Sequence, residues 1–313
     1  MKLATREAAM EDRMLEGKVV AVTGAGRGIG REIALLCARY GARVVVNDYA
    51  PPQGADAGQN PAHDVVAEIV AAGGQACVNQ ASIADPQGAD SIIDDAMNRF
   101  GRIDAVVNNA GILRDRMFHK MSGVEWREVI DVHLNGYFNV SKAAAAHFKE
   151  QGSGAYVHFT STSGLIGNIG QANYSAAKMG IVGLSNSIAL DMQRFGVRSN
   201  CIAPFAWSRM TASIPAETEA DRQRLERLKS MSADKIAPLV AFLCADASRE
   251  VTGQIFCVRK NEIFLFSMPR PVRSMHRSDG WTVESIASDL LPAFKPSMTP
   301  LQRSSDIFAW DPA

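Results

Sequence analysis

The chain has few cysteines, no long apolar run and no net charge, and each of these absences excludes a class of protein. Its five cysteines among 313 residues show neither metal-ligand nor disulfide spacing, which is typical of reduced thiols in a cytoplasmic protein. No run of about 18 apolar residues is present, so we expect no membrane span. The 33 basic residues balance the 33 acidic ones, which gives no support for nucleic-acid binding.

The sequence also lacks a metal-ligand pattern and a signal peptide. Its six histidines are scattered, so we expect no metal site. Residues 1–15 are charged and contain no apolar stretch, which predicts a flexible N-terminal tail rather than a signal peptide. With 47% hydrophobic residues the chain can bury one large core. We therefore expect a single catalytic domain over residues 16–262, followed by a C-terminal extension over 263–313.

A nucleotide-binding unit is the clearest feature that the sequence contains. A valine-rich strand over 18–23 is followed by glycines, then by a helical pattern, and then by a second strand over 44–46 that ends at Asp48. Such glycines let the backbone approach a pyrophosphate at a helix N-terminus, and an acid about 20 residues on can bind ribose hydroxyls. The glycines are Gly24, Gly26, Gly28 and Gly30.

Asp48 also indicates which nucleotide is bound. A carboxylate accepts hydrogen bonds from a ribose diol but repels a 2′-phosphate, so NAD is favoured over NADP. Arg27 argues weakly for NADP, because a guanidinium can pair with phosphate. Arg27 could equally meet the pyrophosphate or solvent, and we give Asp48 more weight.

Strands and helices alternate from residue 18 to about 260. This order predicts a Rossmann-like, doubly wound α/β fold with a seven-stranded parallel sheet and helices on both faces. Asp48, Asn109, Ser161 and Pro204 fall at strand ends, where ligands of such sheets bind. The strands are expected near 18–23, 44–46, 76–79, 104–111, 155–161, 198–204 and 253–258, and the helices near 61–72, 87–99, 124–149, Tyr174 and 234–245.

Tyr174 and Lys178 are four residues apart and therefore lie on one face of the predicted helix. A nearby ammonium favours the phenolate, so we expect Lys178 to lower the pKa of Tyr174. Such a tyrosine can exchange a proton with an alcohol oxygen, and Ser161 could hold that oxygen. Taken alone the spacing is weak, because a surface lysine above a half-buried tyrosine gives the same pattern.

Taken together, the motifs resemble those of the short-chain dehydrogenase/reductase family. The residues that carry the resemblance are TGAGRGIG (23–30), NNAG (108–111), Ser161 and YSAAK (174–178). Within the family, four further segments are similar to the (3R)-hydroxyacyl-CoA dehydrogenase units of peroxisomal multifunctional enzymes of type 2. They are LRDRMF (113–118), DVHLNG (131–136), GNIGQANYSAAK (167–178) and SRMT (208–211).

The resemblance implies a role for each matching residue. Tyr174 would be the acid/base, Lys178 would assist it and hold the nicotinamide ribose, and Ser161 would position the substrate oxygen. The cofactor would be NAD, the substrate a small molecule such as an acyl thioester, and the assembly a homodimer or homotetramer. The implied cofactor-binding residues are Gly24, Arg27, Gly28, Ile29, Gly30, Asp48, Ser82, Ile83, Asn109, Gly111, Tyr174, Lys178, Pro204 and Ser208.

The sequence departs from the family pattern at three places. His133 stands where the family usually has a catalytic asparagine that acts largely through its backbone carbonyl, so a histidine could keep that role. Pro204-Phe205 replaces the usual Pro-Gly, and Ser208 replaces a threonine that meets the carboxamide. Ser82 stands in place of the acid at the adenine site.

The substrate is left open by the sequence. A 3-oxoacyl-ACP reductase or another short-chain alcohol or steroid dehydrogenase fits the same motifs, and an NAD-binding regulatory module without catalysis is the non-enzyme alternative. Residues 205–232 are predicted to form a lid, whose apolar lining would suit an acyl chain or a sterol-like ring. That lining comprises Phe205, Trp207, Met210 and Ile214. The extension 263–313 would be an interface arm, a cover over the site or partly disordered.

Overall fold

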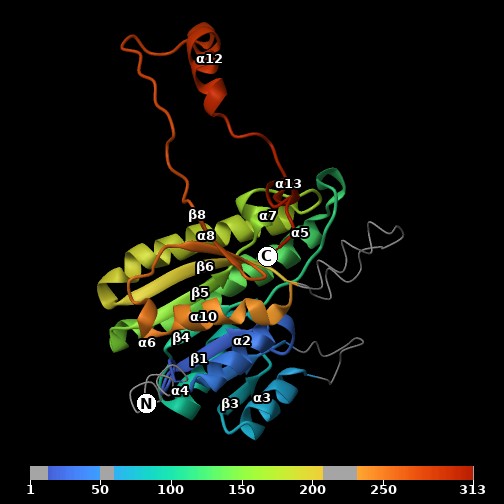
Figure 1. Ribbon diagram of the computed structural model, residues 1–313, viewed down its shortest axis with the longest axis vertical. Coiled ribbons are helices and arrows are strands. Elements are labelled where there is room, and N and C mark those ends of the chain that lie inside the picture. Colours follow the sequence, from blue (N-terminus) through green and yellow to red (C-terminus); the bar gives the residue numbers. More distant parts are fainter. Residues whose placement is uncertain (1–12, 50–59, 207–230, 313) are drawn as a thin grey trace.

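One continuous sheet forms the centre of the protein. The computed structural model describes residues 13–49, 60–206 and 231–312 (Figure 1). The strands lie in the order β3-β2-β1-β4-β5-β6-β7-β8. Their bounds are β1 Val19–Thr23, β2 Arg43–Asn47, β3 Gln75–Asn79, β4 Ala105–Asn108, β5 Gly154–Phe159, β6 Val197–Phe205, β7 Ile255–Arg259 and β8 Glu262–Phe266.

The first seven strands are parallel, as predicted, and the eighth runs antiparallel to β7. All of this eighth strand except Glu262 lies in the residues assigned to the C-terminal extension. A tight turn joins it to β7, and Lys260 in that turn has a φ of 56°. Antiparallel neighbours need no crossover helix, so a strand of five residues could be added without any signal of a further βα unit.

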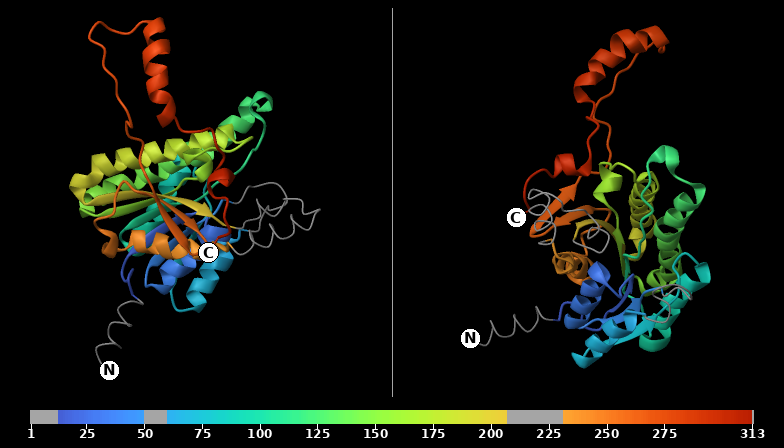
Figure 2. Two further views of the ribbon diagram at one scale, coloured as in Figure 1. Left: turned by 45° about the horizontal axis from the view of Figure 1, so that its top comes forward. Right: turned by 90° about the vertical axis from the view of Figure 1, so that its right-hand side faces the viewer.

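Helices cover both faces of the sheet, and Figure 2 separates the two layers. Helices α2 (Gly28–Arg39), α3 (Ala62–Ala71) and α10 (Ala237–Cys244) lie on one face. Helices α4 (Pro86–Phe100), α6 (Gly136–Gln151) and α8 (Ala172–Met192) cover the other. The strands β1 and β2 are buried between these layers, which explains why seven of their ten residues are valine or alanine.

The helix predicted over 124–149 is interrupted by a wider turn. Helix α5 (Gly123–Ile130) continues into a π-helical turn, Asp131–Asn135, and then into α6. A π turn adds a residue to the local repeat and re-aims the side chains within it. His133 lies in this turn.

Residues 13–15, the last three of the predicted N-terminal tail, are packed against the folded domain. Leu15 is fully buried, and its backbone N–H donates to Tyr40 O at 3.0 Å. Residues 13–17 thus belong to the folded body. Residues 1–12 lie outside the described residues.

After β8 the chain leaves the body and then returns to it (Figures 1 and 2). We call residues 267–301 the arm and residues 302–310 the return segment. Thr282 caps the arm's helix, because its Oγ1 accepts from the Ser285 N–H at 3.2 Å. That helix comprises α11 (Val283–Ser285), a π turn (Ile286–Leu290) and α12 (Leu291–Phe294), and the return segment contains α13 (Ser304–Ile307).

Candidate active site

The glycine turn between β1 and α2 is closely packed against the end of β4. Gly24 has a φ of +64°, and a Cβ on it would lie 2.7 Å from the Ala110 Cα. A Cβ on Gly30 would lie 2.1 Å from the Gly24 carbonyl oxygen. The Asn109 side chain holds the turn by donating to the carbonyl oxygens of Thr23 and Gly24, both at 3.0 Å. Only glycine fits at these two positions.

This turn forms a cradle at the N-terminus of α2 that fits a dinucleotide. Helix α2 begins at Gly28, directly after Arg27, and nothing lies within 4 Å of where a Gly28 Cβ would be. Ile29 lies in the first turn of the same helix. Free backbone N–H groups and the helix dipole at such an open end favour an anionic pyrophosphate.

Asp48 lies at the end of β2, beside the glycine turn. Its Oδ2 accepts from the Gly26 backbone N–H at 2.7 Å. The contact places a carboxylate next to the cradle, as the sequence predicted. Asn60 supports the same corner by donating to the Asp48 carbonyl oxygen at 2.8 Å.

The other proposed cofactor residues differ in what they offer. The Ile83 side chain is buried in the core against Gly136, so it offers little surface to a ligand. The Ser82 Oγ accepts from the Ala84 N–H at 3.3 Å. Pro204 lies in β6, paired with Val258. Ser208 lies outside the described residues, as do Trp207, Met210, Ile214 and nearly all of the predicted lid.

Ser161, Tyr174 and Lys178 meet at the carboxyl end of β5. Ser161 is the N-cap of α7 (Thr162–Leu165), and its side chain interacts with the Tyr174 phenol, which lowers the pKa of that phenol. The Lys178 ammonium donates to the Phe159 carbonyl oxygen at 2.6 Å and lies 5.4 Å from the centre of the Tyr174 ring. The structure therefore brings together the three residues that the sequence singled out.

The pKa of Tyr174 shifts in the direction opposite to the one expected from Lys178. Burial raises the pKa of Tyr174 to about 12, while the interaction with Ser161 lowers it and Asp115 raises it. Burial also lowers the pKa of Lys178 to about 7, because a low-dielectric surrounding disfavours the charged amine. Burial sets the direction of both shifts, because it acts on each partner against its charged form.

His133 contacts the site through its side chain. Its Nε2 lies 2.8 Å from the Ile112 carbonyl oxygen and 3.1 Å from the Ile112 nitrogen. Its ring meets the Tyr174 ring edge-on at 5.2 Å between centres. A Cβ on Gly111 would lie 2.3 Å from the His133 ring. Burial and Lys178 hold the pKa of His133 well below 6.5, so the ring is neutral near pH 7. The predicted backbone role of His133 stays a prediction.

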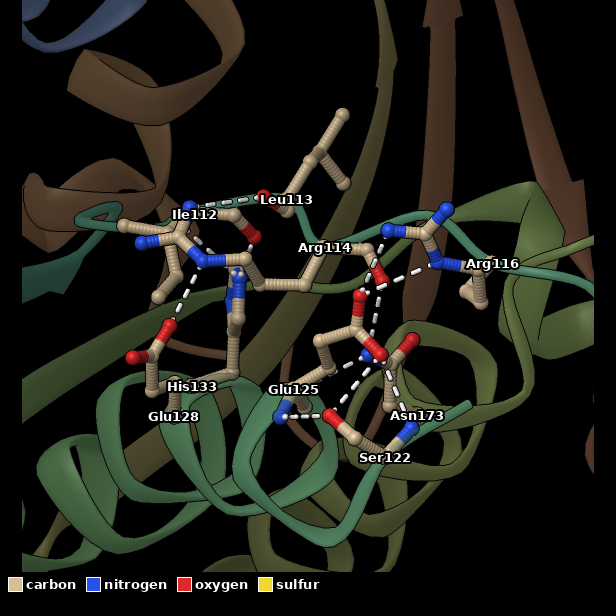
Figure 3. A network of polar contacts seen from close by, with 9 residues as sticks. All are labelled: Ile112, Leu113, Arg114, Arg116, Ser122, Glu125, Glu128, His133 and Asn173. Carbon is tan, nitrogen blue, oxygen red and sulfur yellow. Dashed lines mark hydrogen bonds and ion pairs between the residues drawn. The ribbon is translucent and has the colours of Figure 1, made fainter. Parts of the chain in front are cut away.

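A network of polar contacts fixes the loop above His133 (Figure 3). The Asn173 side chain donates to the carbonyl oxygens of Arg114 and Glu125, both at 3.0 Å. Arg114 pairs with Glu128 at 2.5 Å, and Arg116 pairs with Glu125 at 3.1 Å. These contacts join loop 112–116 to α5 and α8 next to Tyr174.

Sequence reasoning missed Asn173 and Tyr137. Asn173 precedes Tyr174, and its position beside a catalytic candidate was the one available signal. The Tyr137 ring lies 5.2 Å from the Lys178 ammonium and is fully buried. No motif identifies Tyr137, because it reaches the lysine only through the packing of α6 against α8. Within the described residues no cluster of histidine, cysteine or acidic side chains could hold a metal ion, and no helix there is both long and apolar enough to cross a membrane.

The chain matches the family model described as short chain dehydrogenase over residues 18–219. It is 47% identical over 234 residues to a short-chain type dehydrogenase/reductase of Mycobacterium tuberculosis, covering 74% of this chain and 79% of that one. It is 43% identical over 239 residues to the mouse peroxisomal multifunctional enzyme type 2, covering 76% of this chain and 31% of the mouse enzyme. A hydroxyacyl-CoA dehydrogenase of M. tuberculosis is 41% identical over 272 residues, 83% of this chain and 82% of that one.

A crystal structure of a short chain dehydrogenase from Mycobacterium avium superimposes with a TM-score of 0.81 at 36% identity, covering 93% of this chain and 98% of that chain. The chain thus belongs to the short-chain dehydrogenase/reductase family, and it is an oxidoreductase. Members of this family typically bind NAD or NADP. The predicted family and enzyme class are confirmed.

Proposed function

We propose that this protein is an NAD-dependent dehydrogenase of secondary alcohols, with (3R)-hydroxyacyl-CoA thioesters as substrates. The proposal rests on one observation: Ser161, Tyr174 and Lys178 lie together at the carboxyl ends of the strands, where the glycine cradle also lies. A nucleotide-binding module without catalysis would have no need of all three side chains beside its cofactor.

Each of the three side chains has a task at the alcohol. The Tyr174 hydroxyl exchanges a proton with the substrate oxygen, and the Ser161 hydroxyl holds that oxygen from beside the phenol. Lys178, fixed on the Phe159 carbonyl oxygen, supplies positive charge beside the phenol as the phenolate forms. The nicotinamide, when bound, accepts hydride from the alcohol carbon or returns it to the ketone.

NAD is the proposed cofactor because of Asp48. Its carboxylate lies at the glycine cradle, where it would accept from ribose hydroxyls and repel a 2′-phosphate. The cradle, Asn109 and Gly111 would lie along the dinucleotide. Tyr174 and Lys178 would meet its nicotinamide end.

Hydroxyacyl-CoA substrates are proposed from the relatives. One relative is a hydroxyacyl-CoA dehydrogenase, and the chain aligns with a part of a peroxisomal multifunctional enzyme. Because it spans only 31% of the length of that mouse enzyme, activities of the whole multifunctional protein do not transfer to it. A homodimer or homotetramer stays a prediction.

The test is a panel of (3R)- and (3S)-hydroxyacyl-CoAs of several chain lengths, with simple secondary alcohols as controls, followed by NADH absorbance. We expect the (3R)-thioesters to be oxidised fastest. Tyr174→Phe should abolish this turnover, because it removes the exchangeable proton, while NADH binding measured by fluorescence survives. Turnover retained by Tyr174→Phe would refute the assignment.

Two other outcomes would point to the alternatives. Faster reduction of an acyl-ACP ketone than of the matching acyl-CoA ketone, at equal concentration, would identify a 3-oxoacyl-ACP reductase. Tight NAD binding without turnover of any alcohol would identify a regulatory module.

A further inference from the structure

The return segment lies directly beside the residue that follows the proposed catalytic serine. The Ser304 Oγ donates to the Thr162 Oγ1 at 2.7 Å, and the Ser304 backbone N–H donates to the Gly167 carbonyl oxygen at 3.0 Å. Ser304 is 8% exposed and Thr162 is 6% exposed, so water competes little for these bonds. One residue of the return segment thus contacts both ends of the turn 162–167.

This turn needs such support because it is short. Helix α7 has four residues, and the N–H groups of Ile166 and Gly167 both fold back to the Thr162 carbonyl oxygen. So short a helix gains little from its own hydrogen bonds and depends on outside contacts. Ser161 belongs to the same unit, since its Oγ accepts from the Ser163 N–H at 3.1 Å. A shift of the turn would therefore move the Ser161 hydroxyl.

The far end of the return segment is fixed to the edge of the sheet. The Phe308 ring meets Phe205 of β6 at 4.9 Å and Phe264 of β8 at 5.3 Å between ring centres. The Trp310 indole N–H donates to Glu262 at 2.9 Å, and Arg259 donates to the Trp310 carbonyl oxygen. Edge-on aromatic pairs and these polar bonds hold the segment at a second place. Ser304 is thus presented to the turn by a segment that is itself anchored.

We propose that Ser304 is a positioning residue for the dehydrogenase reaction: it holds the turn 162–167 in place and thereby keeps the Ser161 hydroxyl in its position beside Tyr174. This inference rests on the proposed function. It assigns to the C-terminal extension an indirect part in the chemistry, through the hydrogen bonds of Ser304 to Thr162 and Gly167.

The test is Ser304→Ala in the full chain, assayed with the hydroxyacyl-CoA that the wild type oxidises best. Loss of one buried hydrogen bond should lower kcat by roughly 3- to 10-fold, because a mispositioned Ser161 aids the transition state less. The KM for the thioester and the Kd for NADH should stay within about twofold of wild type. The rising limb of the pH–rate profile should move to higher pH, because the interaction with Ser161 lowers the pKa of Tyr174.

Three variants distinguish positioning from simple damage. Ser304→Thr keeps the hydroxyl and should retain the wild-type kcat. Ser305→Ala, at the exposed neighbouring position, should change neither kcat nor the pH–rate profile. Thr162→Val removes the other partner, so the double variant with Ser304→Ala should be no slower than either single variant.

Two results would overturn the proposal. One is a wild-type kcat in Ser304→Ala. The other is a lower kcat with an unmoved pH limb, which would show that only the general fold was weakened. Either result leaves the proposed function standing, provided that the wild type turns over the thioester. Failure of the wild type on the whole panel would instead refute the proposed function.

Discussion

Asp48 shows how a single side chain can serve the fold and the cofactor together. One of its carboxylate oxygens accepts from the Gly26 N–H, which fixes the acid against the glycine turn. A Cβ on Gly26 would lie 2.7 Å from that same oxygen, so the close approach depends on glycine. The negative charge is therefore fixed in one place, and a fixed charge discriminates between NAD and NADP better than a mobile one.

Asp48→Asn tests this discrimination, because the amide oxygen can still accept from Gly26 while the charge is removed. We expect the ratio of kcat/KM with NAD to kcat/KM with NADP to fall by about tenfold or more. Asp64→Asn, at an exposed acid in the first turn of α3, is the matched control and should leave the ratio unchanged. A wild-type ratio in Asp48→Asn, or a wild type that prefers NADP, would contradict our interpretation of Asp48.

At the scale of elements, the start of α5 organises one wall of the site. Ser122 and Glu125 form a reciprocal capping box: the Ser122 Oγ accepts from the Glu125 N–H at 3.2 Å, and the Glu125 carboxylate accepts from the Ser122 N–H at 2.8 Å. The same carboxylate pairs with Arg116, and the Glu125 carbonyl oxygen accepts from Asn173 (Figure 3). One helix terminus thus supports loop 112–116 and the first turn of α8.

Ser122→Ala should lower the free energy of unfolding by about 1 kcal/mol, because an N-cap oxygen is lost from α5. Ser122→Thr keeps that oxygen and should lose only a few tenths of a kcal/mol. Ser297→Ala, at an exposed serine of the arm, is the control for removing a surface hydroxyl. Urea unfolding of the three variants measures the effect, and equal stability of Ser122→Ala and wild type would show that the cap is dispensable.

At the scale of the whole molecule, buried neutral histidines link stability to pH. His158 is fully buried between the Tyr137 and Tyr156 rings, and burial lowers its pKa from 6.5 to about 3. Burial also lowers the pKa of His133. Below pH 6.5 the unfolded chain binds protons at these residues and the folded chain does not. Their contribution is therefore fully present above pH 6.5 and is lost as the pH falls toward 3.

The free energy of unfolding should accordingly fall between pH 7.5 and pH 5.5. His158→Phe keeps a ring between the two tyrosines and should reduce that fall by about 1 kcal/mol, since each pH unit below the unfolded pKa costs about 1.4 kcal/mol per group. Urea unfolding at the two pH values, at fixed protein concentration, provides the measurement. The same fall in His158→Phe and wild type would show that His158 does not titrate on unfolding.

Sequence and structure agree where local pattern decides and differ where packing does. Valine runs and glycine turns in the sequence predict all seven parallel strands. The i, i+4 spacing likewise predicts that Tyr174 and Lys178 share one helix face, as they do in the structure. The sequence predicts a lowered pKa for Tyr174, whereas burial raises it. The difference arises because the degree of burial depends on tertiary contacts. The π turn around His133 was missed for the same reason, since a helix pattern does not reveal where an extra residue is accommodated.

The contact between Ser304 and Thr162 also gives the protein an order of maturation. The two residues are separated by 142 positions, and Ser304 follows every strand of the sheet. During synthesis at about 5–20 residues per second, the ribosome completes the glycine cradle and the sheet before it makes Ser304. The glycine cradle is therefore expected to form early. The contact of Ser304 with the turn 162–167 is expected to form last. A nascent chain could then hold its cofactor while it is still a poor catalyst.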